Sequence, residues 1–238
     1  MSKLLHGIPL TGIVLSLFLV AEIAHASIGK AVAVIQQAVV FRDTRDSVLD
    51  VGKPVFAGDL LKSGPIGLAQ LVFTDDTRLV VGPNSSLRID TYLLRNQDRV
   101  KDLSISALRG SFRFLSGNSP SKAYTIATTN ATIGVRGTAF DISSRADASG
   151  VLTYAGKVTI CDLKKQCATA RPGDLYDVGT NGELRLIDDP AEKLAYIKAY
   201  FPFAFDQSAL LSMFWVNLSV WHANLEEEFG RPSAGSPG

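Results

Sequence analysis

The chain has few of the residues on which most enzyme chemistry depends. Its 238 residues include three histidines and two cysteines. His6 and His25 stand near the N-terminus, and His222 stands in the C-terminal part, far from the glycine-rich stretches. Acid–base catalysis by histidine, a catalytic triad or a zinc site needs an imidazole close to a nucleophile or to further ligands. We therefore predict that the protein is not an enzyme and has no catalytic residues, no cofactor and no metal ion.

An excess of charge of one sign is also lacking. The chain has 24 Lys+Arg and 23 Asp+Glu, which gives a net charge of +1. A nucleic-acid partner usually requires a clear positive excess, so none is expected. The adjacent acids Asp75-Asp76 and Asp188-Asp189 stand in turn and helix-start contexts, where a solvated turn or an N-terminal cap explains them better than a catalytic pair.

The first 26 residues have the pattern of a signal peptide. Lys3 supplies the positive charge, residues 8–21 form an apolar run, and Ala24-His25-Ala26 offers a small-x-small cleavage site before Ser27. The apolar run is shorter than the roughly 20 residues of a membrane-spanning helix, and Pro9 and Gly12 interrupt it. We expect a cleaved peptide and a periplasmic or secreted protein, with an uncleaved membrane anchor as the alternative.

The two cysteines are consistent with export. Cys161 and Cys167 stand in the sequence CDLKKQC, a spacing that can close a hairpin. In an exported chain such a pair is most simply a disulfide. A metal clip and a redox pair are weaker alternatives, because metal sites usually need four ligands and redox pairs usually have the spacing C-x-x-C.

The residues after the leader alternate between apolar and polar in short runs, separated by turn signals every 8 to 12 residues. This pattern is typical of an all-β sandwich, barrel or roll. We predict a mainly β fold: a single β-sandwich or roll-like domain of many short strands, spanning residues 27–188, followed by a C-terminal α-helical appendage.

The clearest strand pair is expected within residues 124–143. Two alternating stretches flank the run Gly134-Val135-Arg136-Gly137-Thr138, which we interpret as a tight backbone corner between them. Arg136 is then either solvated or a buried guanidinium that pins neighbouring carbonyls, and we favour the second. On this interpretation, Gly137→Val destabilises the fold by more than about 2 kcal/mol through backbone strain and crowding.

Several motifs resemble the signature of the FecR domain, a periplasmic module of bacteria. These motifs are Gly58-Asp59-Leu60-Leu61-Lys62-Ser63-Gly64, the hairpin at residues 69–77, the strand at residues 82–89, Leu108-Arg109-Gly110-Ser111-Phe112-Arg113, and ATIGVRGTAFDI at residues 131–142. The similarity covers roughly residues 55–160. Asp76 and Thr129 depart from the pattern, at turn positions where the family usually has Gly and Pro. The resemblance implies structural roles for Gly58, Asp59, Gly134, Arg136, Gly137 and Thr138.

Composition changes towards helix at residue 189. We predict a helical segment over residues 189–230, with one helix at 191–200 and a second at 207–228, and a disordered tail at 231–238. The second helix would carry an apolar seam, and the residues predicted for partner binding are Leu211, Phe214, Trp215, Leu218 and Trp221. Three roles stay open for this face: packing on the protein's own sheet, binding of a partner, and contact with a membrane surface.

Three functional hypotheses follow. The first is an exported, non-catalytic FecR-type binding or scaffold protein that contacts envelope proteins or polymers. The second is a FecR-like sensory or regulatory component that relays an envelope signal to a membrane partner. About seven residues precede the apolar run, too few for the segment with which the family's namesake regulates a sigma factor. A third and weaker hypothesis is a hydrolase that uses surface carboxylates such as Asp75 or Asp174.

Overall fold

The computed structural model describes residues 26–96, 99–120 and 123–222. The predicted signal peptide, apart from Ala26, and the predicted tail lie outside these residues. Within them the chain forms fifteen strands, three short helices and a helical stretch at residues 219–222, so the prediction of a mainly β fold is confirmed. None of the helices in this part of the chain is both long and apolar enough to span a membrane.

The strands run in chain order from the N-terminus. They are β1 (Gly29–Ile35), β2 (Ala38–Arg42), β3 (Arg45–Val48), β4 (Pro54–Val55), β5 (Leu60–Ser63), β6 (Leu68–Phe73), β7 (Arg78–Val81), β8 (Ser86–Asn96), β9 (Arg99–Leu115), β10 (Tyr124–Ala127), β11 (Ala131–Ser144), β12 (Ala148–Asp162), β13 (Cys167–Ala170), β14 (Leu175–Gly179) and β15 (Leu184–Leu186). The helices are α1 (Pro190–Tyr200) and the 3₁₀ helices η2 (Pro202–Ala204) and η3 (Ser212–Phe214).

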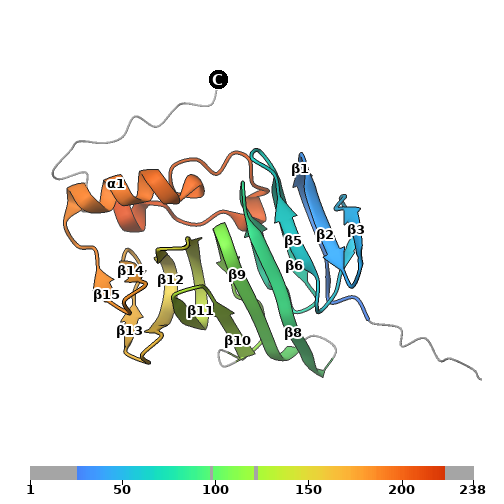
Figure 1. Ribbon diagram of the computed structural model, residues 1–238, viewed down its shortest axis with the longest axis horizontal. Helices are drawn as coiled ribbons and strands as arrows, with labels where there is room; N and C mark the ends of the chain where they lie inside the picture. The colour runs from blue at the N-terminus through green and yellow to red at the C-terminus, as the bar shows by residue number, and fades with distance from the viewer. Residues whose placement is uncertain (1–25, 97–98, 121–122, 223–238) are drawn as a thin grey trace, which may run out of the picture.

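Strand β9 is the centre of the sheet because its two halves have different neighbours. Its first half pairs antiparallel with β8 and parallel with β10. Its last residues pair antiparallel with β7 and β11. Gly110, with φ of 106°, lies between the two halves. This arrangement lets one continuous sheet curl around a core (Figure 1).

Both faces of the sheet are covered near its centre. Phe112, Phe114 and Phe140 belong to the main core, where the rings of Phe114 and Phe140 have centroids 5.5 Å apart. Arg113 stands between Phe112 and Phe114, and Asp141 directly follows Phe140, so both point to the opposite face. On that face lie α1 and the chain that follows it (Figure 1).

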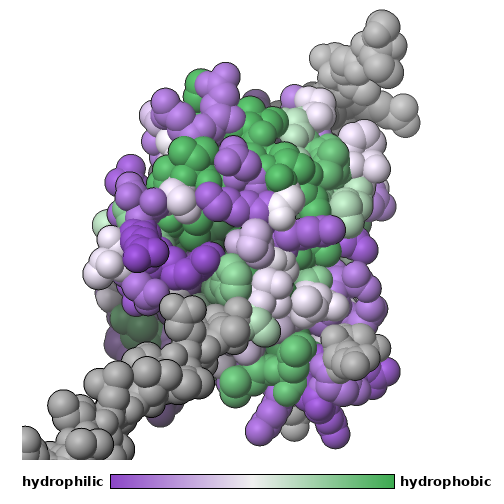
Figure 2. Space-filling view, turned by 90° about the vertical axis from the view of Figure 1, so that its right-hand side faces the viewer, coloured by the Kyte–Doolittle hydropathy of each residue, from purple (hydrophilic) through white to green (hydrophobic). Residues whose placement is uncertain are grey.

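At the N-terminal end of the sheet, β3 pairs only with β2, so one of its edges is free of described strands. All four of its residues are exposed, and the first two are the charged Arg45 and Asp46. Figure 2 looks onto this end of the molecule and shows apolar groups at the surface between polar ones. Charges on a short edge strand discourage pairing with another chain.

The expected corner at residues 134–138 is a bulge inside one long strand. β11 runs without interruption from Ala131 to Ser144, and its pairing with β12 shifts register between Arg136 and Ala139. Gly137 has φ of 59° and Gly156, on β12, has φ of 73°. A Cβ at Gly156 would lie 2.0 Å from the Gly137 carbonyl oxygen, whereas a Cβ at Gly137 would meet nothing within 4 Å. The predicted crowding at Gly137 is therefore wrong, and the positive φ is the constraint that remains.

The predicted second helix is wrong for most of its length. Asp189 caps α1 by accepting a hydrogen bond from the Glu192 backbone N–H at 2.8 Å. After α1, the chain is irregular apart from η2 and η3, and helical residues begin again only at Ser219. The spacing of apolar residues resembles a helical seam, but Phe214 and Trp221 pack on the sheet from a largely irregular chain. Residues 223–228 of the predicted helix lie outside the described residues.

Candidate interaction site

The chain from residue 201 to residue 222, here called the C-terminal segment, crosses the outer face of the sheet (Figure 1). It contributes Phe201, Ala204 and Trp221 to one apolar cluster with β12 and β14. Phe203, Leu210 and Phe214 form a second cluster with β6 and β7. The segment thus packs on the sheet across several strands, which brings residues far apart in sequence into contact.

A buried ion pair lies under the C-terminal segment. Arg113 of β9 donates two hydrogen bonds to Asp141 of β11, at 2.6 and 2.8 Å, and both side chains are shielded from solvent. The Tyr154 hydroxyl also donates to Asp141, at 2.8 Å. The remaining donors of Arg113 reach the segment, at the Phe203 carbonyl oxygen (3.1 Å) and the side-chain oxygen of Gln207. One guanidinium therefore ties two strands and the segment together.

The electrostatics of this cluster keep Arg113 and Tyr154 in fixed protonation states. Burial opposes the charge of Arg113, but the Asp141 carboxylate outweighs it and the pKa of the guanidinium is raised. Burial, followed by the charge of Asp141, raises the pKa of Tyr154 well above its ordinary value. Arg113 therefore stays charged and Tyr154 stays neutral, so neither is suited to transfer protons near neutral pH.

Polar contacts hold the segment along the rest of its path. The Gln70 side chain on β6 donates to the Ala209 carbonyl at 3.2 Å and accepts from the Leu211 N–H at 2.8 Å. Gln207 makes a similar pair of bonds with the backbone of Val216, at 3.1 and 2.9 Å. This second amide closes residues 207–216 into a loop, which explains why the segment has a defined path without helix.

The outer side of this loop carries exposed apolar groups. Leu211 is 42%, Met213 40% and Trp215 52% exposed, and we call these three residues the apolar ridge. The Trp215 indole N–H donates to the Leu210 carbonyl at 2.9 Å, which holds the ring in place. Exposed aromatic and methionine side chains that lie together at a surface are typical of protein interaction sites.

The five residues predicted for partner binding divide between two environments. Phe214 and Trp221 are buried, at 0% and 1% exposure, and so belong to the protein's own core. Leu218 is half-buried. Leu211 and Trp215 are exposed and belong to the apolar ridge. A binding role stays a prediction for the two exposed residues.

The structure corrects the interpretation of Arg136 and places the other motif residues. Arg136 is exposed, and within the described chain its side chain makes no hydrogen bond or ion pair. The buried guanidinium that we predicted for Arg136 belongs instead to Arg113. Gly58 has φ of 89° and precedes the buried Asp59, which accepts two hydrogen bonds from Arg42 at 2.7 and 2.8 Å. Thr138 is buried, whereas the unstrained Gly134 is half-buried.

Two further predictions concern the cysteines and the paired acids. Cys161 and Cys167 form a disulfide between β12 and β13, as expected. Asp75 is not solvated: it is 1% exposed and accepts hydrogen bonds from Ser119 and Tyr124, each at 2.7 Å. It therefore secures a turn.

The described residues contain no group of three or more His, Cys, Asp or Glu that could hold a metal ion. The buried charges at Arg113 and Asp141 satisfy each other, and the ridge has only apolar side chains. The exposed ridge can contact another molecule, but the ion pair and the ridge offer no nucleophile with an adjacent base.

The Arg113 position was part of a sequence motif, whereas no sequence signal identified its partner Gln207.

Comparisons with known proteins agree with the motifs. Residues 59–159 match the family model described as FecR protein. No curated protein matches the chain. Two crystal structures of a "putative anti-sigma factor" from Parabacteroides distasonis ATCC 8503 are 18% identical to it, with TM-scores of 0.44 and 0.45. The alignments cover 57% and 58% of this chain and 62% and 63% of those chains, so the chain spans less than two thirds of their length. The resemblance indicated by the sequence motifs is confirmed for residues 59–159, which form a FecR domain.

Proposed function

We propose that this protein is a non-catalytic regulatory component of the bacterial cell envelope, which passes on a signal by contact with a protein partner through the apolar ridge. The observation that carries the proposal is the exposure of Leu211, Met213 and Trp215 on a segment anchored to a FecR domain. The scaffold hypothesis shares the same surface. Regulation is preferred because signalling is the role that the FecR family implies.

The anchoring of the segment favours a contact surface over a flexible tail. Arg113, Gln70 and Arg78 each bond to the segment from the sheet, the last through the Met213 carbonyl at 3.0 Å. A rigid apolar surface loses little conformational entropy on binding, so more of its contact energy appears as affinity. The expected partner is a protein with a complementary apolar groove.

The proposal is tested in the native host with a photo-crosslinking amino acid at position 215 and, as a control, at position 163. Leu163 is 63% exposed and lies on the hairpin between β12 and β13, away from the ridge. Trp215→Glu should reproduce the change in gene expression caused by deletion of the whole gene, and Leu163→Glu should not. Crosslinking at 215 without any change in expression would favour the scaffold hypothesis instead.

Export forms a separate part of the proposal. We expect the mature protein to begin at Ser27 and to fractionate with periplasmic or secreted proteins. N-terminal sequencing of the protein from fractionated cells distinguishes this from the uncleaved anchor. An intact N-terminus in the membrane fraction would support an anchored relay and would contradict a cleaved leader.

A further inference from the structure

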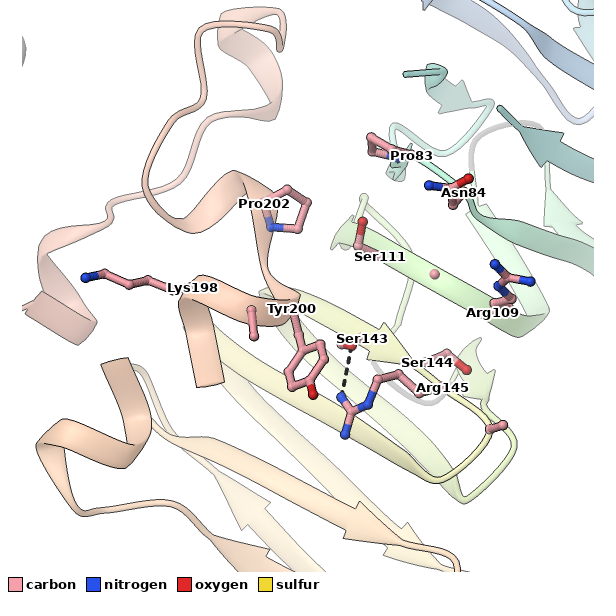
Figure 3. A pocket seen from close by; sticks show the side chains of 13 residues that line it. Pro83, Asn84, Arg109, Ser111, Ser143, Ser144, Arg145, Lys198, Tyr200 and Pro202 are labelled. Atoms are coloured by element: carbon pink, nitrogen blue, oxygen red, sulfur yellow. Dashed lines mark hydrogen bonds between the residues drawn. The ribbon is translucent and has the colours of Figure 1, made fainter. Parts of the chain in front are cut away.

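A cleft with a volume of about 550 Å³ lies between the sheet and the end of α1, apart from the apolar ridge (Figure 3). Pro83 and Asn84 line one side and Tyr200 and Pro202 the other, while Ser111 of β9 lies between them. The walls thus combine apolar rings with hydroxyl and amide groups. This composition suits a small ligand with both an apolar and a polar part.

The charged residues that line the cleft are all positive: Arg109, Arg145 and Lys198. No carboxylate is among the lining residues. Asp147 and Asp177 stand behind Arg145, at 3.3 and 3.6 Å from its nitrogens, and offset its charge. Arg109 and Lys198 are both exposed and make no hydrogen bond or ion pair with any described residue. Among the described residues, neither cation has a counter-charge: Arg109 supplies one positive charge in the cleft, and Lys198 supplies a second at its rim.

Arg145 is held in position by the groups around it. Its guanidinium lies 3.9 Å from the centre of the Tyr200 ring and donates to the Tyr196 hydroxyl at 3.0 Å and to the Ser143 hydroxyl at 3.2 Å (Figure 3). Burial disfavours its charge, but the interaction with Tyr196, followed by the charge of Asp147, outweighs this and raises the pKa of Arg145. This arginine is thus a permanently charged, preorganised part of the wall.

Arg109 lies at a bulge in β9, where the pairing with β8 shifts register: Ser86 faces Arg109, but Leu87 faces Ala107. The next residue, Gly110, has φ of 106°, and a Cβ there would lie 2.2 Å from the Ser85 hydroxyl oxygen. Ser85 accepts from the Ser111 N–H at 3.0 Å and donates to the Ser111 carbonyl at 3.2 Å. The backbone beside Arg109 is therefore fixed, while its five N–H donors stay available. Lys198 stands at the rim, and its ammonium points away from the other labelled residues (Figure 3). Its charge adds to the positive electrostatic potential around the cleft.

We propose that this cleft binds a small organic oxyanion, with the anionic group at Arg109 and the apolar part against Tyr200 and Pro202. Guanidinium groups make charge-assisted hydrogen bonds to oxyanions, and these bonds are about twice as strong as neutral ones. The proposal goes beyond a regulatory role and does not depend on it. No residue of the apolar ridge is required.

The test is a titration of the full mature chain with phenyl phosphate, followed by ¹⁵N–¹H correlation spectra. Saturable shifts are expected at the amides of Arg109, Gly110 and Arg145. Phenol, which has the ring but not the phosphate, should cause no comparable shifts, and inorganic phosphate should bind more weakly than phenyl phosphate. Arg109→Gln should weaken the binding of phenyl phosphate by about tenfold, and addition of Lys198→Gln should weaken it further.

The matched control is the double variant Arg88→Gln, Lys101→Gln. It removes the same charge as the Arg109, Lys198 pair from exposed residues of β8 and β9 that do not line the cleft. It should leave the affinity within about twofold of the unmodified protein. Equal weakening by both double variants, shifts that do not saturate, or equal binding of phenol would each overturn the proposal. The spectra themselves report whether every variant is folded.

Discussion

Replacement of Arg113 by methionine should destabilise the protein strongly, because it leaves a buried carboxylate without its cation. The side chains of Arg113 and Asp141 are 0% and 2% exposed. In Arg113→Met, the Tyr154 hydroxyl, at 2.8 Å, is the only side-chain donor that the described part of the chain still offers to Asp141. Breaking a buried pair in this way costs about 3 to 5 kcal/mol. We expect a loss of this size in the free energy of unfolding, measured by urea denaturation.

Arg42→Met is the matched control. Arg42 and Asp59 make the same two-bond contact, at 2.7 and 2.8 Å, but the Arg42 side chain is 40% exposed. Water can therefore replace the lost guanidinium, and Asp59 still accepts from the Phe56 N–H at 2.9 Å. A loss of about 1 to 2 kcal/mol is expected for this variant.

The reasoning also predicts where Arg113→Met acts. Because Arg113 bonds to Phe203 and Gln207, its loss should loosen the C-terminal segment before the sheet unfolds. Trp221, which is 1% exposed, reports this through its fluorescence in a Trp215→Phe background, where it is the only tryptophan left. The double variant Arg113→Met, Asp141→Leu should recover much of the stability, since no charge is left unpaired. A loss below about 1 kcal/mol, or equal losses for Arg113→Met and Arg42→Met, would refute the account.

Three more predictions concern other parts of the chain. Gly156→Ala should lower the free energy of unfolding, measured by urea denaturation, by more than about 3 kcal/mol, and Gly137→Ala by only about 1 kcal/mol. The reason is that only the Cβ at position 156 would meet backbone atoms, and equal losses would contradict this. Replacement of both Cys161 and Cys167 by alanine should cost about 2 kcal/mol in the same assay if the disulfide acts on the unfolded chain. Burial raises the pKa of Tyr92 to about 12, so its contribution to stability is complete below pH 10 and is lost as pH rises towards 12. The absorbance at 295 nm of the wild type minus Tyr92→Phe should show a tyrosine that titrates near 12; titration near 10 would contradict the burial argument.

The FecR motifs were the most reliable guide in the sequence because each is a local requirement of the backbone or of a turn. Gly58 has the positive φ that its motif implies, and Asp59 is buried beside it. Alternation along β9 is likewise local, and it puts Phe112 and Phe114 in the core. The prediction that Arg136 is buried was wrong. Two flanking glycines indicate that the backbone bends, but they do not indicate which side chain is buried there. In this chain the buried guanidinium belongs to Arg113, whose partners are 28 and 94 residues away.

By itself, the sequence determined the mainly β fold, the FecR domain, the disulfide pair and the start of α1, because alternation, glycine conformation and capping all act within a few residues. The tertiary structure decided the path of the C-terminal segment, where apolar spacing suggested a helix and Gln70, Arg113 and Gln207 instead bind an irregular chain to the sheet. It also decided that Phe214 and Trp221 are core residues while Trp215 is exposed. The cleft at Arg109 likewise exists only because β9, β11 and α1 meet there. Such features depend on contacts between distant residues, which no local pattern records.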